Sequence, residues 1–167
     1  MKIVIITPEE DIKNEIDTVN DLFRSGLERL HLRKNDYYTS DYRRYIRNID
    51  PEFHNRVVVT AGYELYNEFE LGGIHLNSAA RRDESVRKKI SHIPASAVST
   101  SFHTWQKIID NDFRYGYVFI SPVFDSISKK EYKANINPYG ATETKQKLAA
   151  KHRYLSLIHI SEPTRPY

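Results

Sequence analysis

The chain alternates short apolar runs with helical patterns six times in succession. The apolar runs have the length of strands and cover 2–7, 30–33, 56–60, 74–76, 97–100 and the residues from 117 onward. The helical patterns that follow cover 11–24, 42–49, 63–71, 83–90, 104–111 and 141–153. In the first of them Ile12, Ile16, Val19 and Phe23 recur at 4-3-4 spacing, and Gly26 ends the helix. Six such units predict a parallel sheet with right-handed crossovers, either a closed barrel or a doubly wound sheet.

The composition is that of one soluble domain. Of the 167 residues 40% are hydrophobic, which can fill a core, and no apolar run approaches the length of a transmembrane helix. The apolar start is only as long as a strand, so we expect no signal peptide. The absence of cysteine excludes disulfides and thiolate metal sites, and it suits a reducing cytoplasm, which is the predicted location. A net charge of +3 with dispersed basic residues does not favour nucleic acid as a partner, and the oligomeric state stays open.

The residues after the sixth apolar run carry the clearest chemical signal. They read SPVFDSISKK over 121–130 and follow the buried-strand pattern of 117–120. Such a loop, at the end of a parallel strand, is typical of the catalytic face of an α/β barrel. Its hydroxyl and ammonium groups suit an anionic, phosphate-bearing ligand. The alternative is a solvated loop in which the lysines bind nothing.

Four segments at strand ends together resemble the thiamine phosphate synthase/TenI family. They read LHLRK over 30–34, GIHL over 73–76, STSFHT over 99–104 and SPVFDSISK over 121–129. The resemblance covers nearly all of residues 1–154 and implies an α/β fold, a TIM-type (β/α)8 barrel, here with about six βα units. It also implies an enzyme of thiamine biosynthesis that acts on small phosphorylated substrates. That enzyme is a transferase, which joins hydroxymethylpyrimidine pyrophosphate to thiazole phosphate and releases pyrophosphate.

The resemblance implies a phosphate-binding set of residues. In the synthases a Gln-x-Arg-x-Lys pattern after strand two grips the pyrophosphate. Here Arg33 keeps the arginine, whose guanidinium makes bidentate contacts with phosphate. His31 stands in the place of the glutamine, and Lys34 comes one residue before the lysine position, which Asn35 holds. The family's hydroxyls and lysine after strand six fall on Ser126, Ser128 and Lys129.

The resemblance also implies two catalytic residues after strand five. Ser101 matches the family's serine, and His103 matches a histidine that the TenI branch uses to isomerise a thiazole carboxylate phosphate. An imidazole titrates near neutral pH, so it can move a ring proton without a metal. Synthases carry a histidine there too. We therefore place the synthase first, with a TenI-like thiazole tautomerase, an isomerase, or a non-catalytic barrel that binds phosphate ligands as alternatives.

The positions that hold Mg²⁺ in the synthases differ in this chain. The family uses an Asn-Asp pair after strand three and an aspartate after strand four, whereas this chain has Thr60, Ala61 and Ala80. Alanine cannot ligate a hard cation that prefers oxygen. Asp83 is a nearby carboxylate. We predict no metal site built by these residues, so either Mg²⁺ is held mainly by substrate oxygens or the chain has another activity.

The C-terminal residues have an unusual origin in our interpretation. Residues 155–165 read LSLIHISEPTR, which is the translation of a transposase library adapter, residue for residue. We therefore interpret 1–154 as a partial barrel and 155–167 as a non-native tail. Without strands seven and eight and their phosphate loops, we expect this polypeptide to be inactive. The alternating pattern of 155–160 predicts that the tail pairs beside the sixth strand and that Pro163 ends the pairing.

Overall fold

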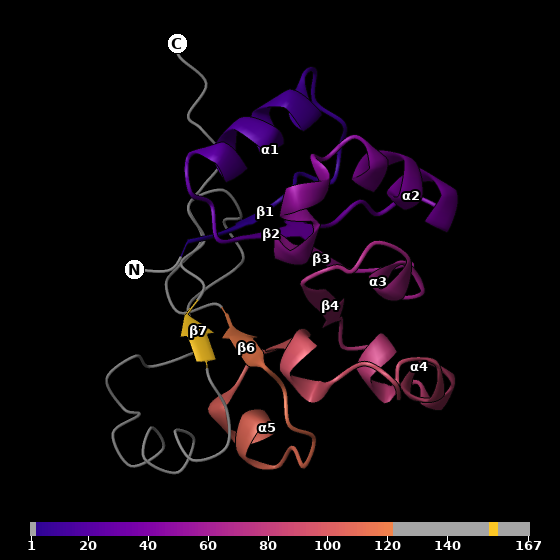
Figure 1. The fold of residues 1–167 in the computed structure, drawn as a ribbon. Coiled ribbons are helices and arrows are strands. Elements are labelled where there is room, and N and C mark those ends of the chain that lie inside the picture. Colours follow the sequence, from indigo (N-terminus) through magenta and orange to yellow (C-terminus); the bar gives the residue numbers. More distant parts are fainter. Residues whose placement is uncertain (1–2, 122–153, 157–167) are drawn as a thin grey trace. The chain divides into compact units, whose positions relative to one another are not determined.

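The computed structural model of the chain describes residues 3–121 and 154–156. The chain divides into two compact units, Met1–Ile93 and Pro94–Tyr167. Each unit contains parallel strands with helices between them (Figure 1). The alternation of strands and helices that the sequence predicts is therefore confirmed in both units.

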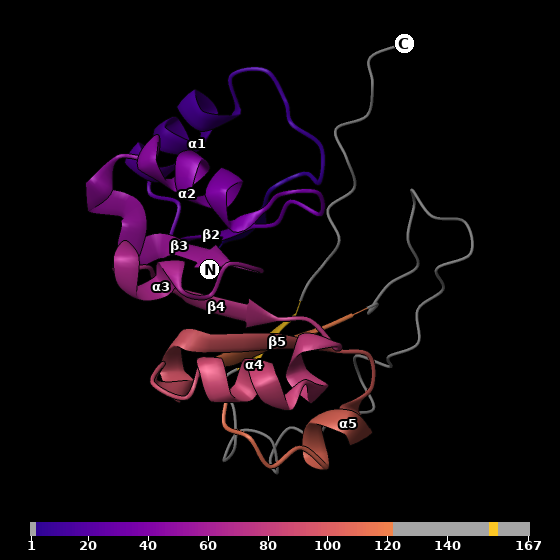
Figure 2. The same cartoon turned by 90° about the vertical axis from the view of Figure 1, so that its right-hand side faces the viewer.

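The strands of the first unit form a parallel sheet in chain order. They are β1 (Val4–Ile6), β2 (Arg29–Leu32), β3 (Val57–Val59) and β4 (Gly73–Leu76). The helices between and after them are α1 (Glu15–Arg24), α2 (Thr39–Arg47), α3 (Leu65–Glu68) and α4 (Glu84–Lys89), with short 3₁₀ helices η1 (Pro51–Arg56) and η2 (Ala80–Arg82). Figures 1 and 2 show α1 and α2 side by side, on the same side of the strands.

The start of α1 differs from the prediction. The spacing predicts a helix from Asp11, but α1 begins at Glu15. Asn14, the residue before it, has a φ of 60°, in the left-handed region that ends regular helical geometry. Ile12 therefore lies outside the helix and is 57% exposed, so its predicted place in the apolar stripe is wrong. The predicted end is confirmed, because Gly26 follows α1 with a φ of 98°.

The interior of the first unit is mainly apolar. All three residues of β3 are fully buried, which is the pattern of a parallel strand covered on both faces. The predicted stripe of Tyr42, Tyr45, Ile46 and Ile49 is also buried. So are three strand residues, Leu30, Leu32 and Ile74. Burying one such side chain stabilises a fold by about 1.5–3 kcal/mol. This packing holds the ends of the strands in place, and polar residues follow them in the sequence.

The second unit holds β5 (Val98–Phe102), α5 (Trp105–Ile109) and β6 (Tyr117–Ile120), preceded by the 3₁₀ helix η3 (Ala95–Ala97). The two strands are parallel and pair Ser101 with Phe119. A Cβ at Gly116 would lie 2.0 Å from the carbonyl oxygen of Ser96, so the start of β6 requires glycine. The helix predicted over 141–153 lies outside the described residues.

A third strand of this unit, β7 (Tyr154–Ser156), pairs parallel with β6. Its register places Leu155 beside Phe119 and Ser156 beside Ile120. The predicted pairing of the tail with the sixth strand is therefore confirmed for these two tail residues. The predicted end of that pairing at Pro163 lies outside the described residues.

Deletion of residues 155–167 is expected to change the free energy of unfolding by no more than about 0.5 kcal/mol, the usual size of a change at an exposed position. The reason is that an unpaired strand edge accepts any extended segment, and we interpret this segment as non-native. Urea unfolding of the full and shortened chains measures the effect. A cooperative transition that disappears on deletion would show that the segment is a genuine part of the fold.

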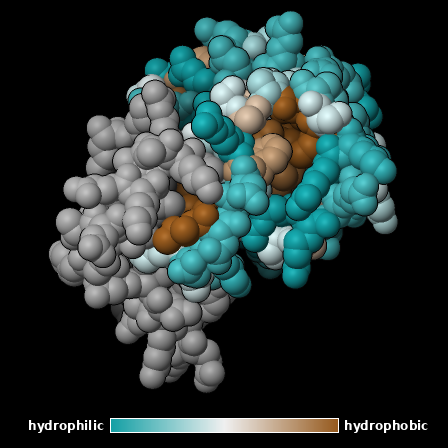
Figure 3. Space-filling model, turned by 90° about the horizontal axis from the view of Figure 1, so that it is seen from below, coloured by the Kyte–Doolittle hydropathy of each residue, from teal (hydrophilic) through white to brown (hydrophobic). Residues whose placement is uncertain are grey.

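The face of the molecule in Figure 3 is mainly polar where it is described. Figure 3 shows hydrophilic residues over most of the described part of one face, with hydrophobic residues in recesses. Within 3–121 and 154–156, no helix combines the length and the apolar character that crossing a membrane requires.

Candidate functional site

Polar residues follow the carboxyl ends of the strands in the first unit. Thr7, Arg33 and Thr60 come directly after β1, β2 and β3. Backbone hydrogen bonds extend the sheet to this row, because Thr7 N donates to His31 O at 3.0 Å and Thr60 N donates to Leu32 O at 3.3 Å. Since these strands are parallel, the residues lie at one edge of the sheet, as the sequence predicts for this unit.

The backbone of Arg33 is held firmly and its side chain is partly free. The Thr7 hydroxyl accepts a hydrogen bond from Arg33 N and donates one to Arg33 O, both at 2.9 Å. The side chain is 49% exposed, and its guanidinium forms an ion pair with the Glu9 carboxylate. Arg33 therefore presents an accessible, permanently charged group that contacts an anion within the protein. The phosphate-binding role of Arg33 stays a prediction.

Lys34 occupies a different environment from Arg33. Its side chain is fully buried, and its ammonium contacts Glu15 Oε2 at 2.7 Å, Glu10 O at 2.7 Å and Asp11 Oδ1 at 3.2 Å. These contacts account for all three donors of an ammonium group. The Tyr42 hydroxyl holds the Lys34 backbone as well, through bonds to its N at 3.1 Å and its O at 3.0 Å. These contacts favour a structural role for Lys34, and its substrate-binding role stays a prediction.

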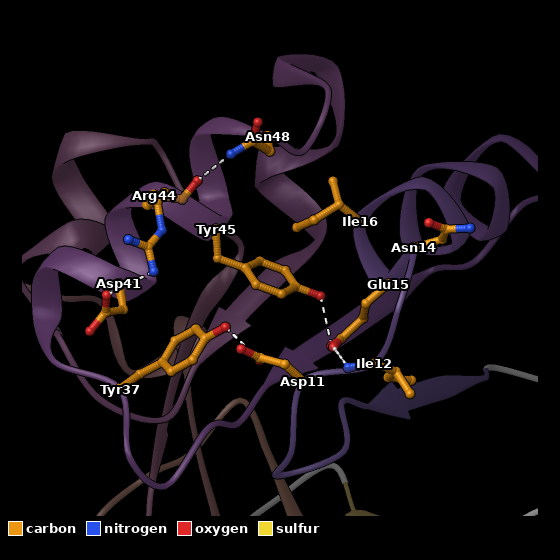
Figure 4. A pocket seen from close by; sticks show the side chains of 10 residues that line it. All are labelled: Asp11, Ile12, Asn14, Glu15, Ile16, Tyr37, Asp41, Arg44, Tyr45 and Asn48. Atoms are coloured by element: carbon orange, nitrogen blue, oxygen red, sulfur yellow. Dashed lines mark hydrogen bonds and ion pairs between the residues drawn. The ribbon is translucent and has the colours of Figure 1, made fainter.

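A pocket of about 350 Å³ is lined by residues from the segment 11–16, at and just before the start of α1, and by Tyr37, Asp41, Arg44, Tyr45 and Asn48, in and next to α2 (Figure 4). On its walls the Tyr45 hydroxyl donates to Glu15 Oε1 at 2.9 Å, and the Tyr37 hydroxyl donates to Asp11 Oδ1 at 2.6 Å. Burial and the neighbouring carboxylates raise the pKa of Tyr45 and Tyr37 far above the usual value, so both remain protonated donors. None of the predicted site residues within the described ranges lines this pocket. Sequence reasoning missed it.

The buried His31 contacts the half-buried His75. The two rings meet edge to face with centroids 5.2 Å apart, and His31 is 1% exposed. Burial, and then the nearby Arg33 and Arg81 cations, lower the pKa of His75 to about 4. Burial and the neighbouring His75 hold the pKa of His31 well below its usual value. Both imidazoles are therefore neutral near pH 7, so His31 offers a hydrogen-bonding group where the family has glutamine.

The residues at the family's metal positions do not fit Mg²⁺. The Thr60 hydroxyl donates to Leu32 O at 3.2 Å and contacts the Tyr42 hydroxyl at 3.1 Å. Asp83 caps α4, accepting bonds from Ser85 N at 2.8 Å and Val86 N at 3.4 Å. Ala61 and Ala80 carry no side-chain oxygen. Across the described parts of the chain, no group of three or more His, Cys, Asp or Glu side chains is arranged to hold a metal ion.

In the second unit, one contact orients His103. Its Nδ1 lies 2.8 Å from the carbonyl oxygen of Ser121, the residue that follows β6. A carbonyl oxygen only accepts, so Nδ1 carries the proton and, in the neutral ring, Nε2 is the acceptor. Ser101 lies on β5, two residues before His103. Ser126, Ser128 and Lys129 lie outside the described residues.

The comparisons with known proteins agree with this architecture. The chain matches the family model described as thiamine monophosphate synthase over residues 3–156. It is similar to the crystal structure of thiamine phosphate pyrophosphorylase from Bacteroides thetaiotaomicron, with 29% identity and a TM-score of 0.67, over 95% of this chain and 73% of that one. No curated protein matches it.

A second similar structure, thiamine phosphate pyrophosphorylase from Pyrococcus furiosus, shares 12% identity with a TM-score of 0.58, over 93% of this chain and 85% of that one, and so shows the fold alone. The predicted fold class, an α/β fold of the TIM-barrel type, is confirmed by these matches together with the parallel strands. The family model spans residues of both units, from β1 to β7. The chain therefore belongs to the thiamine monophosphate synthase family.

Proposed function

We propose that the chain is a thiamine phosphate synthase, a transferase that joins hydroxymethylpyrimidine pyrophosphate to thiazole phosphate. Membership of the family and the similarity to the Bacteroides thetaiotaomicron structure support this proposal. The observation that carries it is Arg33, whose half-exposed side chain follows β2 and contacts an anionic side chain through its guanidinium. A planar guanidinium with a fixed backbone suits the bidentate binding of a phosphoryl group.

The main build-up of negative charge in the reaction occurs on the leaving group. When the pyrimidine and the thiazole join, the pyrophosphate departs with the electron pair of the broken carbon–oxygen bond. Negative charge then grows on its oxygens, and cationic donors that are already in place stabilise it. We assign this role to Arg33 and, outside the described residues, to Ser126, Ser128 and Lys129. No step is assigned to Mg²⁺, since the residues at the family's metal positions do not fit it.

A thiazole tautomerase is the second candidate, and the orientation of His103 favours it. The Ser121 carbonyl fixes the proton on Nδ1 and leaves Nε2 as a base. In a tautomerase, Nε2 would take a proton from one ring carbon, and the resulting imidazolium would return it to another carbon. The net result of these two proton transfers is an isomerisation that needs no metal. A barrel that binds the phosphate ligand without catalysis is the remaining alternative.

Two assays separate these functions, one with hydroxymethylpyrimidine pyrophosphate and thiazole phosphate together, and one with the thiazole carboxylate phosphate alone. Equal amounts of thiamine phosphate and pyrophosphate, formed with or without Mg²⁺, would support the synthase. Interconversion of the thiazole isomers without condensation would support the tautomerase, and binding without turnover would support a non-catalytic member. Because we also propose that 155–167 is non-native, both assays should include a chain continued beyond Tyr154 with the natural sequence of the gene.

The variant His103→Ala is expected to lower tautomerase activity by about 10²–10⁴-fold, the usual contribution of a positioned acid–base group. Synthase activity should fall far less, because condensation is driven by the departure of pyrophosphate. Rates of both reactions, measured on the same preparation, give the comparison. His92→Ala is the control, since His92 is exposed and precedes β5. Equal losses in both reactions would contradict the role assigned to His103.

A further inference from the structure

The Glu9 carboxylate bridges two side chains at the end of β2. One of its oxygens, Oε1, pairs with Arg33 Nη2, and the other, Oε2, accepts a hydrogen bond from Asn35 Nδ2 at 2.6 Å. Arg33 and Asn35 stand where the family pattern has its arginine and lysine. The two Glu9 oxygens thus contact the donors of two nearby side chains, as two oxygens of a phosphoryl group would.

Both cations at this strand end are paired with carboxylates of the protein itself. Lys34 is directed into the buried contacts with Glu15 and Asp11, so its charge is used inside the protein. Arg33 is paired with Glu9. A pyrophosphate that approaches Arg33 therefore meets a carboxylate already in the place that its own oxygens would take, and like charges repel.

We propose that Glu9 is an internal competitor for the anion site, which occupies Arg33 in the empty protein and withdraws when pyrophosphate binds. The inference rests on the proposed function, which assigns pyrophosphate to Arg33. Glu9 is suited to this exchange because it lies between β1 and α1 and its side chain is 49% exposed. Exposed ion pairs are weak, so a ligand with several negative charges can displace the carboxylate. An anion must therefore bind Arg33 more strongly than the Glu9 carboxylate does in order to enter the site.

Titration calorimetry of the 167-residue chain with inorganic pyrophosphate tests this inference. The variant Glu9→Gln keeps the size and hydrogen-bonding capacity of the side chain and removes its charge. We expect it to bind pyrophosphate about three- to tenfold more tightly, because the competing charge is gone. Glu10→Gln is the matched control, since Glu10 is the neighbouring exposed acid and only its backbone carbonyl contacts Lys34. Each variant is compared with the wild type by urea unfolding, so that a change in stability is not mistaken for a change in affinity.

The variant Arg33→Ala, alone and combined with Glu9→Gln, separates this inference from the proposed function. Competition through Arg33 predicts that Glu9→Gln has no effect once Arg33 is removed. If Arg33→Ala weakens binding but Glu9→Gln does not strengthen it, Glu9 is a structural clamp and the inference is wrong, while the proposed site stands. If Arg33→Ala binds pyrophosphate as the wild type does, or if neither the wild type nor Glu9→Gln binds it, the assignment of pyrophosphate to Arg33 is also wrong.

Discussion

Replacement of Lys34 by methionine is expected to lower the free energy of unfolding by about 3–5 kcal/mol, the usual cost of breaking a buried ion pair from one side. The ammonium is fully buried against Glu15, whose side chain is 8% exposed. Methionine fills the same space without charge, so the Glu15 carboxylate is left buried without its cation. Urea unfolding measures the loss directly.

Two further variants identify the cause of that loss. Lys13→Met removes a lysine from an exposed position just before α1 and should leave stability nearly unchanged. Glu15→Gln in the Lys34→Met background removes the orphaned charge and should restore part of the loss, because Tyr45 can still donate to the amide oxygen. A Lys34→Met variant as stable as the wild type would show that the pair contributes nothing.

The variant Arg33→Ala is expected to weaken pyrophosphate binding roughly ten- to a hundredfold, equivalent to about 1.5–3 kcal/mol for a charge-assisted contact. The same result is expected for Lys129→Ala, at a position outside the described residues. Arg47→Ala on α2 is the control, since that side chain is 67% exposed and lies within the same unit. Titration calorimetry supplies the dissociation constants. Normal binding by both variants would mean that the family roles do not transfer to these positions.

The fold was predictable where burial decides it. Three of the described strands, β1, β3 and β6, are short apolar runs followed by a residue with a hydroxyl group, so the hydrophobic pattern predicts their positions. Helix boundaries were less predictable, because they depend on backbone conformation. Nothing in the spacing of Ile12 and Ile16 signals the left-handed Asn14 that delays α1. Likewise α3 covers Leu65–Glu68, shorter than the pattern over 63–71.

The candidate site was predictable in its positions but not in its contacts. Strand-end logic and the family pattern indicate where Arg33 and His103 stand. Which of two adjacent cations is accessible depends on partners far away in the sequence, such as Glu15 for Lys34 and Glu9 for Arg33. Glu9 follows β1 at the same sheet edge, so the strand-end rule was a signal that it belongs near the site.

Amide chemical shifts of the 167-residue chain, followed during titration with inorganic pyrophosphate, test most directly whether an anion site lies at the end of β2. We predict saturable changes in the amide chemical shifts of Thr7, Glu9, Arg33 and Asn35. These residues form the hydrogen-bond network around the Arg33 backbone and the Glu9 carboxylate. Helix α4 of the same unit should be nearly unaffected. Shifts that leave residues 7–9 and 33–35 unchanged, or that never saturate, would contradict the assignment of pyrophosphate to Arg33.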